Sequence, residues 1–300
     1  MQPWLAPDAR PPGADPPPAS PPTTDEPRPA VPPLLAMRPM TVADVLDGGI
    51  AVIKAAPRVI IAIAAAILVP LELVSAWVQR DSLADRGISG AISAATSTNG
   101  SSDVRIDAAA IGLIALSGIA LALVTGAVAA VLRGWLAEST PTAGDALRAS
   151  LHHAPALIVA RIIVHVVELA AAAALLLPLL FVMPMFLATS PAIVFERLGP
   201  WAGIRRSWRL ARTRYGSVLG AASLIAAVSA SLTLALSGLG LLFEFLSFGW
   251  VIDAVCRAAS GLITVPFVGA ATTLVYLDTR IRVEGLDLEL DFAERFTHGV

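Results

Sequence analysis

Five long apolar stretches constrain this chain more than any other feature of its sequence. In chain order they cover residues 59–78, 108–132, 154–188, 217–243 and 258–277. Only Glu72, Arg161 and Glu168 are charged within them. A helix of 18 or more apolar residues spans the hydrocarbon core of a bilayer, which is about 30 Å thick. Because a helix satisfies its own backbone polar groups in lipid, the sequence predicts an all-α, polytopic transmembrane helix bundle.

The composition supports a membrane protein and excludes several other classes. The mean hydropathy is +0.74, and 15% of the residues are charged, whereas soluble proteins have roughly a quarter. The net charge of −2 argues against a nucleic-acid partner. The single cysteine, Cys256, excludes an internal disulfide and a cysteine-rich metal site.

The first 36 residues differ sharply from the rest of the chain. They contain 13 of the 23 prolines, mixed with small and charged residues. Such a segment cannot bury enough apolar surface to offset the entropy of ordering, so a disordered, Pro-rich cytoplasmic tail is predicted. The predicted transmembrane domain then covers residues 37–292, and residues 293–300 form a short C-terminal cytoplasmic tail.

The basic residues predict which loops face the cytoplasm. Fourteen lie in the segments 37–58, 133–155, 189–216 and 278–300, against four in the segments 79–107 and 244–257. Short cytoplasmic loops are enriched in Lys and Arg. The sequence therefore predicts a multi-pass protein of the plasma (inner) membrane, with both termini in the cytoplasm and the loop 79–107 outside.

The stretch 154–188 decides the number of crossings. Both of its ends are predicted to be cytoplasmic, which requires two passes, although 35 residues are few for two spans. Pro178 and Pro184 offer places for a break. Six crossings follow if this stretch is a hairpin, and five if it is one long kinked helix; we favour six.

A weak internal repeat supports six spans. The segments 44–50, 145–151 and 202–208 each precede an apolar stretch and share a pattern of apolar positions. Thr41 and Thr142 stand where helix N-caps are expected. The chain is therefore predicted to use one unit three times, an interfacial amphipathic helix followed by a transmembrane hairpin.

The third of these amphipathic segments is strongly basic. Its apolar face contains Trp201, Ile204, Trp208 and Ala211. The candidate contacts for anionic lipid are Arg205, Arg206, Arg209, Arg212 and Arg214. Each basic side chain near an anionic leaflet contributes about 1 kcal/mol. Two interpretations remain open: anchoring of the helix at the interface, which we favour, and specific recognition of a lipid headgroup.

Three segments resemble one family of membrane proteins. They are residues 38–48 (RPMTVADVLDG), residues 191–202 and 205–210 (PAIVFERLGPWA and RRSWRL), and residues 276–289 (YLDTRIRVEGLDLE). Together they are similar to the actinobacterial glycerophosphoryl diester phosphodiesterase membrane-domain family, over about residues 37–292. The resemblance implies a multi-helix membrane protein of unknown activity, because the family is named after enzymes that contain a separate catalytic domain.

The sequence offers no support for catalysis. Its four histidines are His152, His153, His165 and His298, and none lies in an H-E-x-x-H spacing. A G-x-S-x-G nucleophile motif and a G-x-x-x-x-G-K-[ST] phosphate-binding loop are also missing. We therefore expect a non-enzymatic protein without cofactor or metal.

One polar constellation lies within an apolar stretch. Arg161, His165 and Glu168 are spaced i, i+4 and i+7, so they share one face of the third predicted helix. Ionisable groups in the bilayer usually face the bundle interior and pair with one another. The cluster is either a structural tie between helices, which we favour, or a polar site for a proton, an ion or a lipid headgroup.

Two functions follow from these features. The first is a scaffold or partner subunit of a membrane complex, whose partners are membrane lipids and other membrane proteins or further copies of the chain. The alternative is a transporter or lipid-handling protein with a cavity at Arg161, His165 and Glu168. A scaffold predicts a tightly packed apolar interior, whereas a transporter predicts a polar cavity at mid-depth.

Overall fold

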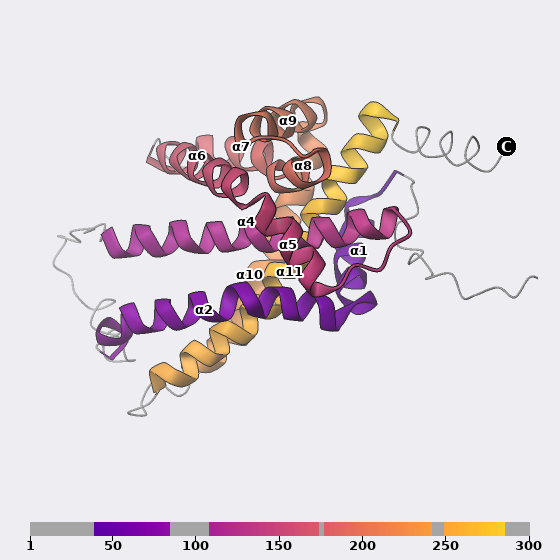
Figure 1. Ribbon diagram of the computed structural model, residues 1–300. Coiled ribbons are helices and arrows are strands. Elements are labelled where there is room, and N and C mark those ends of the chain that lie inside the picture. The colour runs from indigo at the N-terminus through magenta and orange to yellow at the C-terminus, as the bar shows by residue number, and fades with distance from the viewer. Residues whose placement is uncertain (1–38, 85–107, 174–176, 242–248, 286–300) are drawn as a thin grey trace, which may run out of the picture. The chain divides into compact units, whose positions relative to one another are not determined.

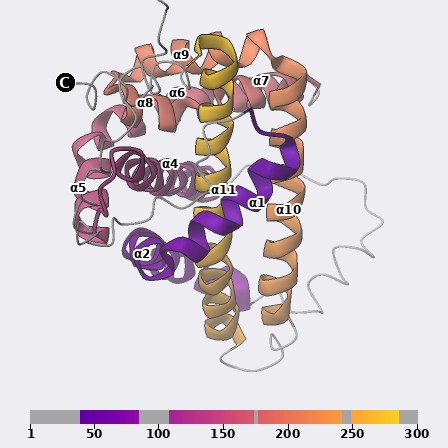
Figure 2. The same ribbon diagram turned by 90° about the vertical axis from the view of Figure 1, so that its right-hand side faces the viewer.

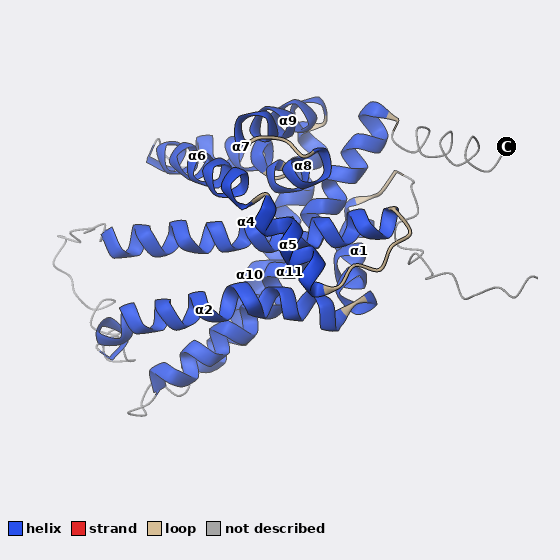
Figure 3. Ribbon diagram, viewed as in Figure 1, coloured by secondary structure: helices blue, strands red, loops and turns tan. Residues whose placement is uncertain are grey.

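The computed structural model describes residues 39–84, 108–173, 177–241 and 249–285, which are almost entirely helical and contain no strand (Figures 1 and 3). The predicted Pro-rich tail 1–36, most of the predicted external loop 79–107 and the predicted tail 293–300 lie outside these ranges. The helices are α1 (Val42–Ala55), α2 (Pro57–Ala84), α4 (Ala108–Leu136), α5 (Ala143–His152), α6 (Ala154–Ala173), α7 (Leu177–Phe186), α8 (Thr189–Glu196), α9 (Pro200–Thr213), α10 (Tyr215–Leu241) and α11 (Gly249–Glu284).

Six segments are long and apolar enough to cross a membrane. They are Pro57–Ser75, Gly112–Leu136, Ala154–Ala172, Pro178–Glu196, Tyr215–Leu236 and Ala254–Glu284. The prediction of an all-α bundle with six apolar spans is therefore confirmed.

The fourth of these segments is broken into α7 and α8. The predicted hairpin ended at Ala188 and left residues 189–216 as a cytoplasmic loop, and this boundary was wrong: α8 is a buried apolar helix that extends the returning arm to Glu196. Pro184 has no N–H to donate to the carbonyl of Leu180. The Tyr215 hydroxyl of α10 donates to that carbonyl instead, at 3.4 Å.

The order of the helices repeats three times. A short amphipathic helix precedes two longer elements in α1/α2/α4, in α5/α6/α7–α8 and in α9/α10/α11, and the second long element of the middle unit is the one broken into α7 and α8. In Figure 1 the far ends of α2, α4 and α6 point to the left, α1 lies toward the right, and α8 and α9 lie at the top.

The three units close into a ring. In each, the short helix and the first long helix pack against the second long element of the preceding unit: α5 and α6 on α4, and α9 and α10 on α7. The first unit completes the ring, because α1 and α2 pack against α11 (Figure 2).

One aligned position seats each short helix. Ser150 Oγ of α5 donates to the Leu123 carbonyl of α4 at 2.7 Å, and Ser207 Oγ of α9 donates to the Met185 carbonyl of α7 at 2.8 Å. At the equivalent Gly49 of α1, an added Cβ would lie 3.2 Å from the Phe267 ring of α11. A small residue is therefore needed three times for the same close approach.

The predicted N-caps of the first two short helices are confirmed. Thr41 forms a capping box with Asp44, and Thr142 forms one with Asp145. The third short helix begins differently, with Gly199 at the N-cap and Pro200 in the first turn, where the missing N–H costs nothing.

Candidate intramembrane binding site

The three ionisable residues of α6 are in contact. Arg161 Nη2 lies 3.4 Å from Glu168 Oε2, and His165 Nδ1 lies 3.1 Å from the same oxygen. Their side chains are largely buried, with exposed fractions of 25%, 20% and 18% in chain order. The helical spacing noted in the sequence thus brings all three groups together around one carboxylate.

A glycine on the neighbouring helix makes room for this cluster. A Cβ on Gly118 of α4 would lie 1.9 Å from His165 Nε2 and 2.8 Å from Arg161 Nε. Sequence reasoning missed Gly118, because a glycine in an apolar span has no chemical signature and its role appears only when α4 packs against α6.

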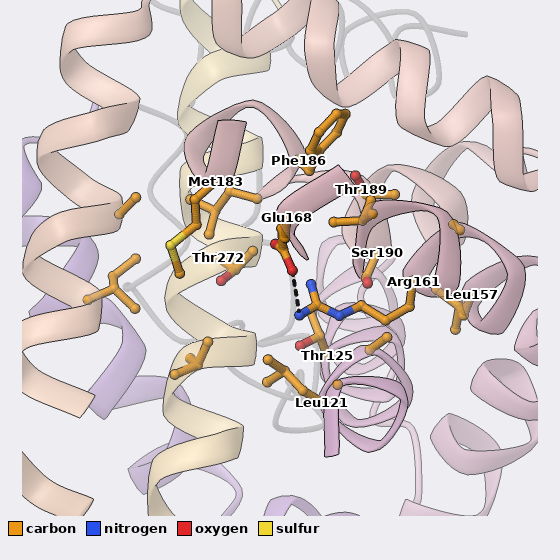
Figure 4. A pocket seen from close by; sticks show the side chains of 18 of the residues that line it. Leu121, Thr125, Leu157, Arg161, Glu168, Met183, Phe186, Thr189, Ser190 and Thr272 are labelled. Carbon is orange, nitrogen blue, oxygen red and sulfur yellow. Dashed lines mark hydrogen bonds and ion pairs between the residues drawn. The ribbon is translucent and has the colours of Figure 1, made fainter. Parts of the chain in front are cut away.

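A cavity of about 270 Å³ adjoins the cluster and is bounded by helices of all three units (Figure 4). Its walls are mainly apolar, with contributions from α4, α6, α7, α8, α10 and α11. Its polar lining residues are Thr125, Arg161, Glu168, Thr189, Ser190, Ser229 and Thr272. The cavity therefore joins a charged pair and several hydroxyls to an apolar surface.

Three of these hydroxyls come from equivalent elements. Thr125 lies on α4, Thr189 on α8 and Thr272 on α11, so the second long element of each unit supplies one buried threonine to the cavity. Thr189 and Thr272 are only 6% and 3% exposed, and their hydroxyls have no hydrogen-bond partner among the described residues. Arg161 Nε is likewise buried and unpartnered within the described ranges.

Buried polar atoms without partners are uncommon, because each costs about 1–3 kcal/mol of desolvation that no hydrogen bond offsets. Arg161 Nε and the hydroxyls of Thr189 and Thr272 all belong to residues that line this one cavity. The cavity also reaches the surface, because two of its lining residues, Met183 of α7 and Ala226 of α10, are exposed. The arrangement is suited to a ligand that supplies the missing partners.

A second set of charged side chains lies where α8, α9 and α11 meet. We call Glu196, Arg206, Tyr276, Arg280 and Glu284 the ion-pair cluster. Arg206 Nε donates to Glu196 Oε1 at 2.7 Å, and both terminal nitrogens of Arg206 bind the Glu284 carboxylate. The Tyr276 hydroxyl donates to Glu196 at 2.7 Å, and Arg280 Nε donates to Glu284 at 3.1 Å.

The ion-pair cluster corrects one predicted residue role. Arg206 was grouped with the lipid-contacting arginines, but its side chain is only 14% exposed and faces two carboxylates. Hydrogen bonds to Glu284 and then to Glu196 raise the pKa of Arg206 above its ordinary value. Arg206 therefore joins helices inside the protein. Arg205, Arg209 and Arg212 are exposed, and Arg214 is half-buried with a hydrogen bond to Ser217.

The apolar face of α9 also differs from its prediction. Ile204 and Ala211 were expected to enter the lipid, but they are buried against the protein. Gly203 lets α9 approach α8 closely, because a Cβ there would lie 2.4 Å from Ile193. Trp201 and Trp208, by contrast, remain exposed.

The three segments that carry the family resemblance converge on α11. The ion-pair cluster joins the second segment to the third. The first segment joins them through the backbone of Met40, whose N–H donates to Asp278 at 2.7 Å and whose carbonyl accepts from Arg282 at 2.7 Å. These segments thus have a packing role that the sequence comparison did not reveal.

No protein-family model, no curated protein and no solved structure matches the chain. Within the described ranges, no group of three or more His, Cys, Asp and Glu residues is arranged to hold a metal ion.

Proposed function

We propose that this membrane protein binds an amphiphilic, lipid-like molecule in the cavity between its three units. The observation that supports this most directly is the convergence of the buried, unpartnered Thr189 and Thr272 hydroxyls and Arg161 Nε on one mainly apolar cavity. Such sites combine apolar walls with a few placed polar groups.

The polar groups indicate the chemistry of the ligand head. Arg161 Nε–H is a donor, and each threonine hydroxyl can donate or accept. A head with several acceptor oxygens, such as a phosphate or a carboxylate, would satisfy these groups, while Glu168 holds the guanidinium in position. The apolar tail would follow the wall toward Met183 and Ala226, where the cavity reaches the surface.

Of the two functions predicted from the sequence, this proposal develops the alternative, a transporter or lipid-handling protein. The scaffold or partner-subunit role required a tightly packed apolar interior, and a cavity with charged lining fits that role less well. The scaffold remains our second proposal. Its support is the close packing of small residues at the crossing of α4 and α11, where a Cβ on Gly269 would lie 3.1 Å from Thr125 Cα.

The binding proposal can be tested with neighbouring threonines of α11. Thr272 lines the cavity, whereas Thr273 is fully buried and its hydroxyl donates to the Gly269 carbonyl at 2.7 Å. We expect native mass spectrometry of the purified protein to detect a retained amphiphile, which Thr272→Val depletes and Thr273→Val leaves in place. Equal retention in both variants, or no retained molecule in the unaltered protein, would contradict the proposal.

From the distribution of basic residues, we also propose that the protein lies in the plasma membrane with both termini in the cytoplasm. Thr140, exposed between α4 and α5, is suited to test it. With Cys256 replaced by serine, Thr140→Cys should react with an impermeant maleimide only after the cells are opened. Labelling of this cysteine in intact cells would show that the orientation is the opposite of the one proposed.

A further inference from the structure

Beyond the cavity, α9 presents a groove on the surface of the protein. The groove has a volume of about 440 Å³ and is lined by Phe186, Trp201, Ile204, Arg205, Trp208, Arg209 and Arg212. Three of these residues are arginines, and none is acidic. The Phe186 and Trp208 rings lie 5.7 Å apart, so α7 and α9 build the wall together.

The three arginines of the groove are available to a ligand. Arg205, Arg209 and Arg212 are exposed, and none forms an ion pair with any residue that the structure describes. At spacings of i, i+4 and i+7 they follow one face of α9 over about 10 Å. The carboxylates that contact α9, those of Glu196 and Glu284, are bound by Arg206.

The neighbouring aromatic residues favour a lipid over a soluble anion. Trp201 is 61% exposed and Trp208 is 37% exposed, and both border the arginines. Tryptophan is enriched at the level of lipid headgroups, where one part of the ring is in contact with apolar groups and the N–H remains hydrated. A phosphate held by guanidinium groups beside an apolar wall is the arrangement that a phospholipid requires.

We propose that this groove is a specific site for an anionic phospholipid. The lipid phosphate lies at Arg205, Arg209 and Arg212. The part of the acyl chain next to the glycerol lies against Phe186, Trp201 and Trp208. This site is separate from the cavity proposed above and does not depend on a ligand there. Phe186 lines both spaces, so the groove and the cavity adjoin at this side chain. A bound lipid would therefore lie next to the cavity wall.

A test must separate a specific site from a general effect of positive charge. The variant Arg205→Gln/Arg209→Gln/Arg212→Gln removes three positive charges from the groove. The control Lys54→Gln/Arg58→Gln/Arg148→Gln removes three from exposed positions of α1, α2 and α5. Binding of phosphatidylglycerol and of phosphatidylcholine to each protein in detergent would be followed by native mass spectrometry, and thermal unfolding would confirm that each variant is folded.

We expect the groove variant to raise the Kd for phosphatidylglycerol by roughly tenfold or more, and the control variant to change it less than about twofold. Trp208→Ala, which retains every charge, should also weaken binding. An equal loss in both triple variants, or equal binding of phosphatidylcholine by the unaltered protein, would overturn the proposal. Tight binding of free glycerol phosphate would instead assign the site to a soluble anion. Should the triple variant fail to fold, Arg209→Gln alone replaces it, with an expected increase of about fivefold in the Kd for phosphatidylglycerol.

Discussion

The ion-pair cluster and the cavity differ in how completely their polar groups are paired. At the ion-pair cluster, every nitrogen of the Arg206 guanidinium binds a carboxylate, and the Tyr276 hydroxyl has a partner as well. At the cavity, Arg161 makes one long contact of 3.4 Å to Glu168, and Arg161 Nε and two threonine hydroxyls find no partner among the described residues. Both regions join elements of different units, yet only one is satisfied by the protein alone.

This difference separates a structural role from a binding role. A fully paired buried cluster rigidifies the fold, whereas a partly paired one costs free energy unless something else completes it. The ion-pair cluster therefore needs no ligand. The cavity retains polar atoms that a ligand can satisfy, which is how binding sites commonly trade stability for function. Three predictions test this contrast, and a fourth concerns an exposed capping box outside both regions; they follow in order of decreasing effect.

The largest effect is expected at the ion-pair cluster. Arg206→Met leaves Glu196 and Glu284 partly buried without their main partner and should lower the free energy of unfolding by about 2–4 kcal/mol. Arg205→Met, on the exposed side of the same helix, should change it by less than about 0.5 kcal/mol. Thermal or denaturant unfolding in detergent measures both. Similar changes in the free energy of unfolding for the two variants would show that the ion-pair cluster does not stabilise the fold.

A smaller effect is expected for the charged pair of α6. Arg161→Gln and Glu168→Gln should each lower the free energy of unfolding by about 1–3 kcal/mol, because each leaves the other charge without its partner. The double variant should cost less than either single one, with a coupling of about 1 kcal/mol in a double-mutant cycle. Additive effects would show that the 3.4 Å contact does not stabilise the protein.

The third prediction concerns the sign of an effect. Thr272→Val removes an unpartnered hydroxyl and should raise the free energy of unfolding of ligand-free protein by about 0.5–1 kcal/mol. Thr273→Val removes a bonded hydroxyl and should lower it by about 1 kcal/mol. Delipidated protein is required, because a bound amphiphile would stabilise the unaltered chain. A loss of stability in both variants would mean that the Thr272 hydroxyl is satisfied in the protein.

The smallest effect is expected at the exposed capping box of α5. The hydrogen bond from the Thr142 hydroxyl lowers the pKa of Asp145 below its ordinary value. A carboxylate with a depressed pKa in the folded state stabilises the protein above its unfolded pKa, and this contribution is lost as the pH falls through the folded pKa. Asp145→Asn should therefore lower the neutral plateau slightly and flatten the acid limb of the stability curve by the same small amount. Equal acid limbs in the two proteins would show that the box adds no pH dependence.

The sequence was sufficient for the features that follow from local pattern. Apolar length predicted five stretches, and the basic residues together with a weak repeat favoured two passes for one of them, which gives the six spans. Thr41 and Thr142, each three residues ahead of an aspartate, were predicted as N-caps. Helical spacing also placed Arg161, His165 and Glu168 on one face. Each of these depends on residues close together in the chain.

Features that depend on distant segments could not be predicted in this way. Whether Arg206 faces lipid or Glu284 is decided by the packing of α9 beside α11, 78 residues away along the chain. The same holds for Gly118, and for the cavity threonines, which lie on three different elements. Pro184 was expected to allow a break, but it lies inside α7, which continues to Phe186. The burial of α8 was not foreseen, because residues 189–196 lie close to charged residues in the chain and were assigned to a loop.

The closed ring of units has a consequence for the order of assembly. The partner of α1 and α2 is α11, so contacts such as Met40 with Asp278 join residues 238 positions apart. During synthesis the hairpin of α2 and α4 enters the membrane long before α11 is made. Until then, the surface of α2 that packs against α11 is in contact with lipid or with an insertion factor. Contacts over such distances slow folding because the intervening chain must be ordered first. We therefore expect the last helix to act as the closing step, and a ribosome stalled before residue 249 to leave an open, protease-sensitive intermediate.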